Sequence, residues 1–361
     1  MTTPANSDKL GFDKLPIRDL GLKIEGTRLA PLVEKFKEEL RQAGVVAVRP
    51  NFYLSTDWGV PFPSVSIGIP FYLARPELLA MHTNLVGHVE GLHDADILRY
   101  FRHEMGHVMN YAYKLYEREE WVAQFGSMTQ PYVEEYRPEP FSTDFVLHLP
   151  GFYAQKHPDE DWAETFAVWM TPGINWRDVY AAWPVVIEKL DYCDSVMAEV
   201  GAIPPLLSTI DDDESVSSLP QTVEEYYQAS TLDSEDLPVG LDGALRTMFD
   251  DFEPSTASKS TQAASQLMRR MEQRLMASVF RWTGHFPERT RELLRYLADR
   301  ADKLLQVYDP ARESEVGLEI AVLVTSLAAT YVRQGSYLAC SESAEEQADP
   351  SDKIEIPSRG T

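Results

Sequence analysis

The chain has 361 residues, 44% of them hydrophobic, and a formal net charge of −24. This length allows about two domains of ordinary size, and the hydrophobic content is enough to bury a core. Such an acidic chain lacks the basic face that binds a phosphate backbone, so we expect no nucleic-acid partner.

The N-terminal sequence and the cysteines bear on the compartment. The first residues, MTTPANSDKLGFDKLP, show no basic stretch followed by an apolar one, and no uncharged apolar run approaches about twenty residues. Cys193 and Cys340 are too few for a disulfide framework or a four-cysteine zinc site. We therefore expect a cytoplasmic protein that does not span a membrane.

Helix and strand patterns alternate in the first part of the chain. The apolar spacing of residues 27–44, TRLAPLVEKFKEELRQAG, predicts a helix. Residues 45–55 and 64–74 are rich in Val, Ile, Tyr and Phe and predict strands. Residues 76–91 predict a further helix, and the next one begins near Asp94, whose side chain can cap its first amides.

The rest of the chain is mainly helical in pattern. The proline-containing stretch 118–158 predicts loops, and DEDWAETFAVWM at 159–170 predicts a helix, as does the stretch 185–200. Further helical patterns follow at 257–283, 287–307 and 312–334.

Composition divides the chain into five parts. We expect a disordered lead at 1–14, a folded domain at 15–202, an acidic serine-rich linker at 203–240, a helical region at 241–335 and a disordered tail at 336–361.

The stretch FRHEMGHVMNYAYKLYE, residues 101–117, carries the first sign of chemistry. His103 and His107 are four apart and lie on one face of a helix, where two imidazoles can hold one tetrahedral ion. Glu104 beside the first histidine can reach a metal-bound water. The motif predicts a zinc site, whereas an ordinary pair of buried histidines is the alternative.

A catalytic zinc usually needs a third protein ligand, often a carboxylate. The metzincin continuation is excluded, because Asn110 and Tyr113 stand where Gly and His would be required. The segment HPDEDWAETFAVWM instead offers Glu160 and Glu164 on one helical face, and its alanines, among them Ala163, let two helices approach closely.

These two segments together resemble the bacterial zinc-binding metallopeptidase family, a gluzincin-like group, over about residues 95–175. The cysteine zinc ribbon that members often carry is absent. The resemblance implies an α+β, zincin-like domain with a small sheet, followed here by a mainly helical C-terminal region.

The resemblance also implies site residues. His103, His107 and a glutamate would hold Zn²⁺, and Glu104 would act as general base. The thermolysin-like order favours Glu160 as the ligand and Glu164 as its supporter. The reverse order stays open.

Further site candidates are weaker in pattern. Asp161 is a third candidate ligand. Tyr153 is the first choice for stabilising the oxyanion, with His157 and His148 behind it, although each of these three also suits a structural role.

The leading hypothesis is a zinc-dependent metallopeptidase acting on a peptide or protein substrate. The strand at 64–74 is a candidate edge for binding an extended peptide. One alternative is a zinc amidase acting on a non-protein amide, and another is a catalytically silent zinc-bound scaffold whose helical region recruits a protein partner.

Overall fold

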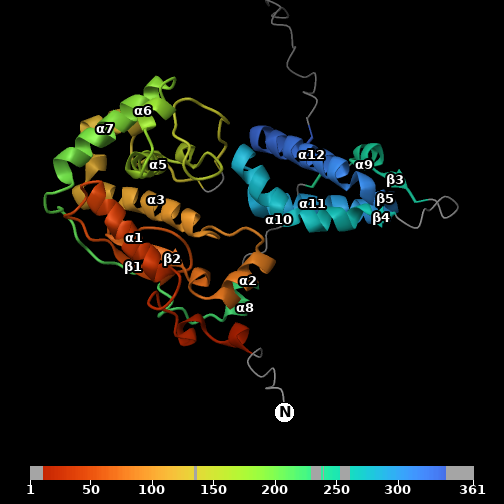
Figure 1. Ribbon diagram of the computed structural model, residues 1–361, viewed down its shortest axis with the longest axis horizontal. Helices are drawn as coiled ribbons and strands as arrows, with labels where there is room; N and C mark the ends of the chain where they lie inside the picture. The colour runs from red at the N-terminus through yellow and green to blue at the C-terminus, as the bar shows by residue number, and fades with distance from the viewer. Residues whose placement is uncertain (1–10, 134–135, 229–236, 239, 253–260, 339–361) are drawn as a thin grey trace, which may run out of the picture.

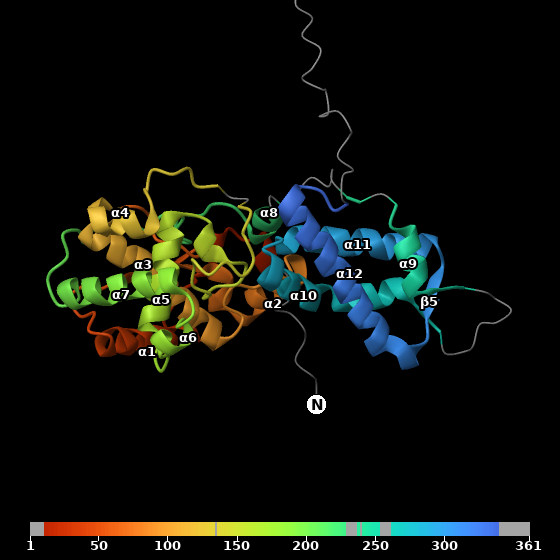
Figure 2. The same cartoon turned by 90° about the horizontal axis from the view of Figure 1, so that it is seen from above.

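A computed structural model describes residues 11–133, 136–228, 237–238, 240–252 and 261–338. The described chain is mostly helical with small sheets, in agreement with the predicted α+β class. Two lobes lie side by side, each around its own hydrophobic core (Figures 1 and 2). We call residues 11–228 the first lobe and residues 240–338 the second lobe.

The first lobe combines helices with one small sheet. Its helices and strands are α1 (Leu29–Gln42), β1 (Asn51–Ser55), β2 (Ser66–Pro70), α2 (Pro76–Leu85), α3 (Asp94–Tyr113), α4 (Glu119–Phe125), α5 (Pro158–Met170), α6 (Trp176–Val179), α7 (Pro184–Val200) and α8 (Val223–Gln228). Short 3-10 turns are η1 (Phe12–Lys14), η2 (Ile17–Leu20), η3 (Phe71–Ala74), η4 (Leu115–Glu117) and η5 (Tyr153–Gln155).

The helical periodicity of the sequence predicts the positions of α1 and α3 correctly. The apolar residues of α1, spaced three and four apart, are buried and include Phe36, whose ring centroid lies 5.4 Å from that of Phe101 on α3. Helix α3 begins at Asp94 as predicted, but its cap differs. The carboxylate of Asp96 accepts a hydrogen bond of 3.3 Å from the His93 amide.

The sheet is smaller than predicted. Strands β1 and β2 pair in parallel with Asn51 opposite Ser66. Both are shorter than the predicted stretches, since Pro50 precedes β1 and the chain turns into η3 after Pro70. Every residue of β2 is buried, and the amide of Gly68 donates 2.8 Å to the carbonyl of Gly59. The segment around Gly59 thus covers this edge of β2 at Gly68, and binding of an extended peptide along the strand stays a prediction.

The predicted acidic linker lies against the first lobe over residues 203–228. The amide of Leu206 donates to Ala112, that of Val65 to Thr209, and that of Val216 to Leu54. Val216 and Val223 are buried in the first core. Composition predicts a solvated segment, but backbone hydrogen bonds and a few spaced apolar side chains are enough to hold it on the lobe.

The second lobe contains the predicted long helices and a small sheet that was not predicted. Its elements are α9 (Asp242–Met248), β3 (Asp250–Asp251), β4 (Gln262–Ala263), α10 (Ala264–Thr283), α11 (Pro287–Lys303), β5 (Gln306–Tyr308), the 3-10 turn η6 (Pro310–Arg312) and α12 (Glu313–Gln334). The strand order is β3-β5-β4, antiparallel throughout. Strands of two or three residues leave no periodic pattern to detect.

Helix α12, together with the turn η6 before it, is long and apolar enough to cross a membrane by length and composition alone. Its inner face, including Ile320 and Val324, packs into the second core, and 39% of the apolar window is buried. Helices in the cores of soluble proteins have the same character, so this one helix is weak evidence for a membrane.

The ends of the chain differ in part from expectation. Residues 1–10 and 339–361 of the predicted lead and tail lie outside the described residues. Tyr337, inside the predicted tail, is 5% exposed, and its hydroxyl lies 3.1 Å from His285 Nε2. The second lobe therefore extends at least to this tyrosine.

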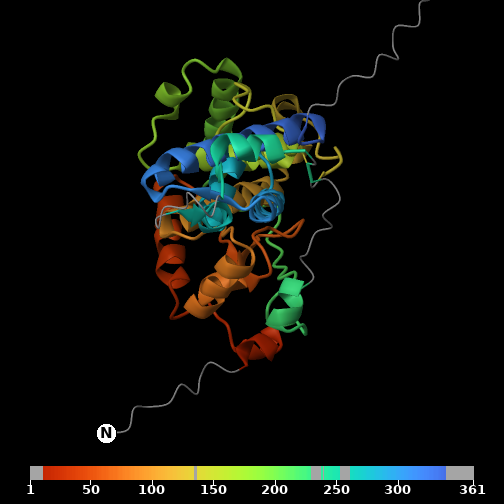
Figure 3. The same cartoon turned by 90° about the vertical axis from the view of Figure 1, so that its right-hand side faces the viewer.

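The lobes meet where α10 ends and α11 begins, with the second lobe in front of the first in Figure 3. The ring of Phe280 packs so closely on Gly151 that a Cβ there would lie 2.6 Å from it. Phe280 also lies 5.6 Å, ring to ring, from His88. The side chain of Gln273 donates to the carbonyl of Thr83 at 3.3 Å.

Candidate metal centre

The centre is built by a close approach of α3 and α5. Gly106 faces Ala163, and a Cβ on Gly106 would lie 2.6 Å from Ala163 Cα. The indole of Trp162 donates 2.7 Å to the carbonyl of Gly106. Small residues at the crossing let the two helices bring their functional side chains together, as expected for Ala163.

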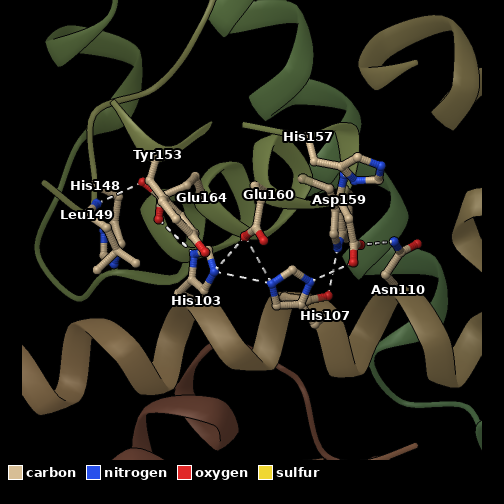
Figure 4. A network of polar contacts seen from close by, with 12 residues as sticks. His103, His107, Asn110, His148, Leu149, Tyr153, His157, Asp159, Glu160 and Glu164 are labelled. Carbon is tan, nitrogen blue, oxygen red and sulfur yellow. Dashed lines mark hydrogen bonds and ion pairs between the residues drawn. The ribbon is translucent and has the colours of Figure 1, made fainter. Parts of the chain in front are cut away.

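Three buried side chains converge between these helices (Figure 4). Glu160 Oε2 lies 3.0 Å from His103 Nε2 and 3.3 Å from His107 Nε2. The two Nε2 atoms are 3.2 Å apart. The helical spacing of the histidines thus produces the predicted convergence, and Glu160 supplies the third atom.

These distances fit a tetrahedral cation. Zinc lies about 2.0–2.1 Å from its ligand atoms, which places neighbouring ligands of a tetrahedron about 3.3–3.4 Å apart. Glu160 Oε2 is buried and receives no hydrogen bond in the described structure. When neither Nε2 atom carries a proton, this oxygen has no partner, and a buried carboxylate oxygen facing two imidazole lone pairs is costly without a cation. His103, His107 and Glu160 can therefore hold a metal ion.

The outer nitrogens of both rings are held by carboxylates. His103 Nδ1 donates to Glu164 Oε1 at 2.8 Å, while Glu164 Oε2 accepts 2.7 Å from the amide of Leu149. His107 Nδ1 donates to Asp159 Oδ2 at 3.0 Å. With their protons on Nδ1, both rings present a lone pair at Nε2 to the same point.

The same carboxylates shape the electrostatics. Burial alone lowers the pKa of His103, but contacts of a protonated ring with Glu160 and Glu164 outweigh it and raise the value to about 10. Burial is likewise outweighed at His107, where Asp159 and Glu160 raise the pKa. Although burial opposes it, the two histidines hold the pKa of Glu160 well below its usual range. The field at the centre favours positive charge.

The comparison with known proteins bears on this geometry. Residues 94–196 match the family model described as "Putative zinc-binding metallo-peptidase". This segment is similar to that family. No curated protein and no solved structure matches the chain significantly. The resemblance predicted from the sequence is thereby confirmed, and the zinc-binding character of the family agrees with the buried His/His/Glu group.

Glu104 lies inside the matched segment beside His103. It is 4% exposed. Among the described residues, none is recorded as donating a hydrogen bond to its carboxylate. Burial raises its pKa to about 7, although the neighbouring histidines oppose this. Two cavities, of about 270 and 700 Å³, both reach His103 and Glu104. The carboxylate is thus open to bound molecules on either side.

Two tyrosines lie next to the candidate metal centre, and one of them was not predicted. The hydroxyl of Tyr132 donates 2.6 Å to Glu160 Oε1. Tyr153, the predicted oxyanion donor, lines both cavities, and its hydroxyl lies 3.4 Å from that of Tyr132. The loop carrying Tyr132 has no periodicity, so its sequence does not indicate this contact.

Asp159 is a second residue that sequence reasoning missed. Its carboxylate accepts hydrogen bonds of 2.7 Å from Asn110 and 2.5 Å from Tyr111, in addition to the one from His107. The acidic run at the start of α5 is the signal that could have indicated it, because its first member lies one residue from Glu160.

The remaining candidates lie in structural positions. His157 Nδ1 accepts from the Asp159 amide and caps α5, and its Nε2 donates to the carbonyl of Gln130. His148 Nε2 lies 3.1 Å from the carbonyl of Arg99. Asp161 points away from the centre and pairs with Lys189 at 2.7 Å. None of these three candidates belongs to the converging group of metal-ligating side chains.

Proposed function

We propose that the protein is a zinc-dependent metallopeptidase of gluzincin type with a zincin-like first lobe. The convergence of His103, His107 and Glu160 around a buried, unpaired oxygen carries this proposal. Glu160 is assigned as the ligand because Oε2 faces both Nε2 atoms. Glu164 is assigned as the supporter because it contacts His103 only through Nδ1.

When bound, zinc lowers the pKa of a water molecule toward neutrality and polarises the scissile carbonyl. Glu104 takes the water proton and passes it to the leaving amine. Its burial suits this work, because a raised pKa makes the carboxylate a stronger base near neutral pH. Glu164 and Asp159 keep the two rings oriented during the reaction.

Tyr153 is proposed to donate a hydrogen bond to the oxyanion. Its ring centroid lies 5.5 Å from that of His103, and the side chain borders both cavities. The hydroxyl of Tyr132 is engaged with Glu160, which leaves it less suited to follow the changing charge of a substrate oxygen.

Peptide hydrolysis is favoured over the alternatives by the shape of the site. Cavities extend to both sides of Glu104, as required for a chain that continues on both sides of the scissile bond. A purely structural zinc has four protein ligands, whereas three ligand atoms converge here next to open space.

The test combines zinc content with hydrolysis of a mixed peptide library. The wild type should bind one zinc per chain, and Glu104→Gln should keep the zinc but lose hydrolysis by at least about a hundredfold. His103→Ala and Glu160→Gln should lose the zinc, while Glu164→Gln should weaken it by about 10–100-fold.

Two results would change the assignment. Zinc loss confined to Glu164→Gln would reverse the order of the two glutamates. A folded wild type that binds zinc but cleaves no peptide would refute the peptidase and favour a scaffold.

A further inference from the structure

The smaller cavity lies between the two lobes, directly beside His103 and Glu104. The first lobe contributes Trp58 and Tyr100, and the second lobe closes the cavity with Phe280, Phe286 and Glu288. Its volume of about 270 Å³ is below the roughly 300–1,000 Å³ typical of sites for whole small molecules. The size suits a single side chain of a longer substrate.

The lining of this cavity is strongly acidic. Asp57, Glu90 and Glu288 border it together with Glu104, and the lining contains one ammonium group, that of Lys156. Desolvation, and then the charge of Asp57, raise the pKa of Glu90 to about 8. Crowding of carboxylates to this degree is relieved when a cation enters.

Positive groups also stand near these carboxylates. Lys156 borders the smaller cavity, and its ammonium lies 4.3 Å from the centroid of the Tyr132 ring. Arg291 and Arg295 border an adjoining cavity that shares Asp57, Glu90 and Glu288. Burial lowers the pKa of His88 to about 4, so this histidine is neutral at pH 7. Among the described lining residues, four carboxyl groups thus stand against one ammonium group.

The walls between the carboxylates are aromatic. Trp58 and Tyr100 stack at 5.0 Å with an interplanar angle of 7°. Phe280 and Phe286 stack at 6.3 Å on the side of the second lobe. Aromatic faces accommodate an alkyl chain and attract a cation, and the carboxylates complete a site for a long, positively charged group.

The larger cavity has a different character. Its carboxylates are Glu104, Asp159 and Glu160, all of which belong to the centre itself, and apolar side chains such as Val60 and Met128 line the remainder. The two sides of the scissile bond therefore present different chemistry.

We propose that the cavity between the lobes binds a lysine or arginine side chain of the substrate, next to the scissile bond. This specificity rests on the proposed peptidase function. It also assigns a role to the second lobe, which supplies one wall of the subsite and the Glu288 carboxylate.

Cleavage rates test the specificity directly. Peptides that differ at one position, with Lys, Arg, norleucine, Gln or Glu placed in turn on each side of the scissile bond, are compared by kcat/KM. The value of kcat/KM for the Lys and Arg peptides should exceed that for the norleucine peptide at least tenfold on one side of the scissile bond only. In Glu288→Gln the ratio of kcat/KM for the Lys peptide to that for the norleucine peptide should fall at least fivefold. Glu292→Gln, on the same helix but outside the cavity, should keep the wild-type ratio.

Binding to the metal-free protein separates this inference from the proposed function. Nα-acetyl-lysine methylamide, which keeps its side-chain ammonium, and its norleucine counterpart are titrated by calorimetry or NMR. Preferential binding of the lysine compound, weakened in Glu288→Gln, supports the subsite even if no peptide is cleaved. Peptide cleavage without preference for Lys or Arg, together with equal binding of both compounds, would overturn the subsite and leave the peptidase standing.

Discussion

Replacing Gly106 by alanine tests the helix contact on which the whole centre depends. The new Cβ would lie 2.6 Å from Ala163 Cα and 3.0 Å from the Ala163 carbonyl oxygen. Carbon atoms in normal contact are about 3.5–4.0 Å apart, so α3 and α5 must separate by about 1 Å. Both neighbouring atoms belong to the backbone, and no side-chain rotation can relieve the clash.

Two effects on stability oppose each other in this variant. Alanine inside a helix is favoured over glycine by about 1 kcal/mol, whereas overpacking costs about 1–3 kcal/mol. The clash is with backbone, so we expect the cost of overpacking to exceed the gain, with a net loss of up to about 2 kcal/mol. Separation of the helices also lengthens the contacts of 3.0 and 3.3 Å from Glu160 to the histidines, so zinc affinity should fall at least about tenfold.

Urea unfolding of the metal-free protein measures the first effect, and competition with a chromophoric chelator measures the second. Gly243→Ala is the matched control, because this glycine lies in α9 with no atom within 4 Å of an added Cβ. It should stabilise the protein by up to about 1 kcal/mol. If Gly106→Ala behaved like this control and bound zinc normally, the proposed contact of α3 with α5 would be refuted.

Two further predictions concern buried carboxyl groups. Hydrolysis needs ionised Glu104, whose pKa is raised to about 7 by burial and lowered again by a bound cation. On the acid side of its pH profile, kcat/KM should therefore fall about tenfold per pH unit, with a midpoint at or under about pH 7. A profile that stays flat down to about pH 4 would require another base. Asp161→Asn leaves Lys189 buried without its carboxylate and should cost about 3–5 kcal/mol in urea unfolding with zinc content unchanged. An unchanged free energy of unfolding would show that this ion pair does not stabilise the fold.

Local spacing predicts the first half of the centre because the relevant geometry lies within one helix. His103, Glu104 and His107 occupy a single face of α3 wherever that helix packs. The apolar periodicity of α1, α5 and α7 is equally local, and their positions agree with the predictions.

The choice between Glu160 and Glu164 depends on information that is not local. Both lie on the same face of α5, so periodicity cannot separate them. The position of α5 along α3, set by the contact of Gly106 with Ala163, decides which carboxylate faces Nε2 and which faces Nδ1. Tyr132 reaches the centre from a loop, and no sequence spacing relates it to His107 or Glu160. Asp159 stands directly before Glu160 in the sequence, but its contact with His107 depends on the same packing of α5 on α3.

The path of residues 203–228 determines which part of the chain can exist as a portable module. A fragment ending at residue 202 would remove Val216 and Val223 from the first core and leave backbone groups such as the Val65 amide without partners. Residue 17 likewise donates its amide to Gln221, so the two ends of this module are tied together. The smallest exchangeable unit therefore reaches Gln228. A chain in which a different second lobe followed that point would keep the metal centre and replace one wall of the cavity between the lobes.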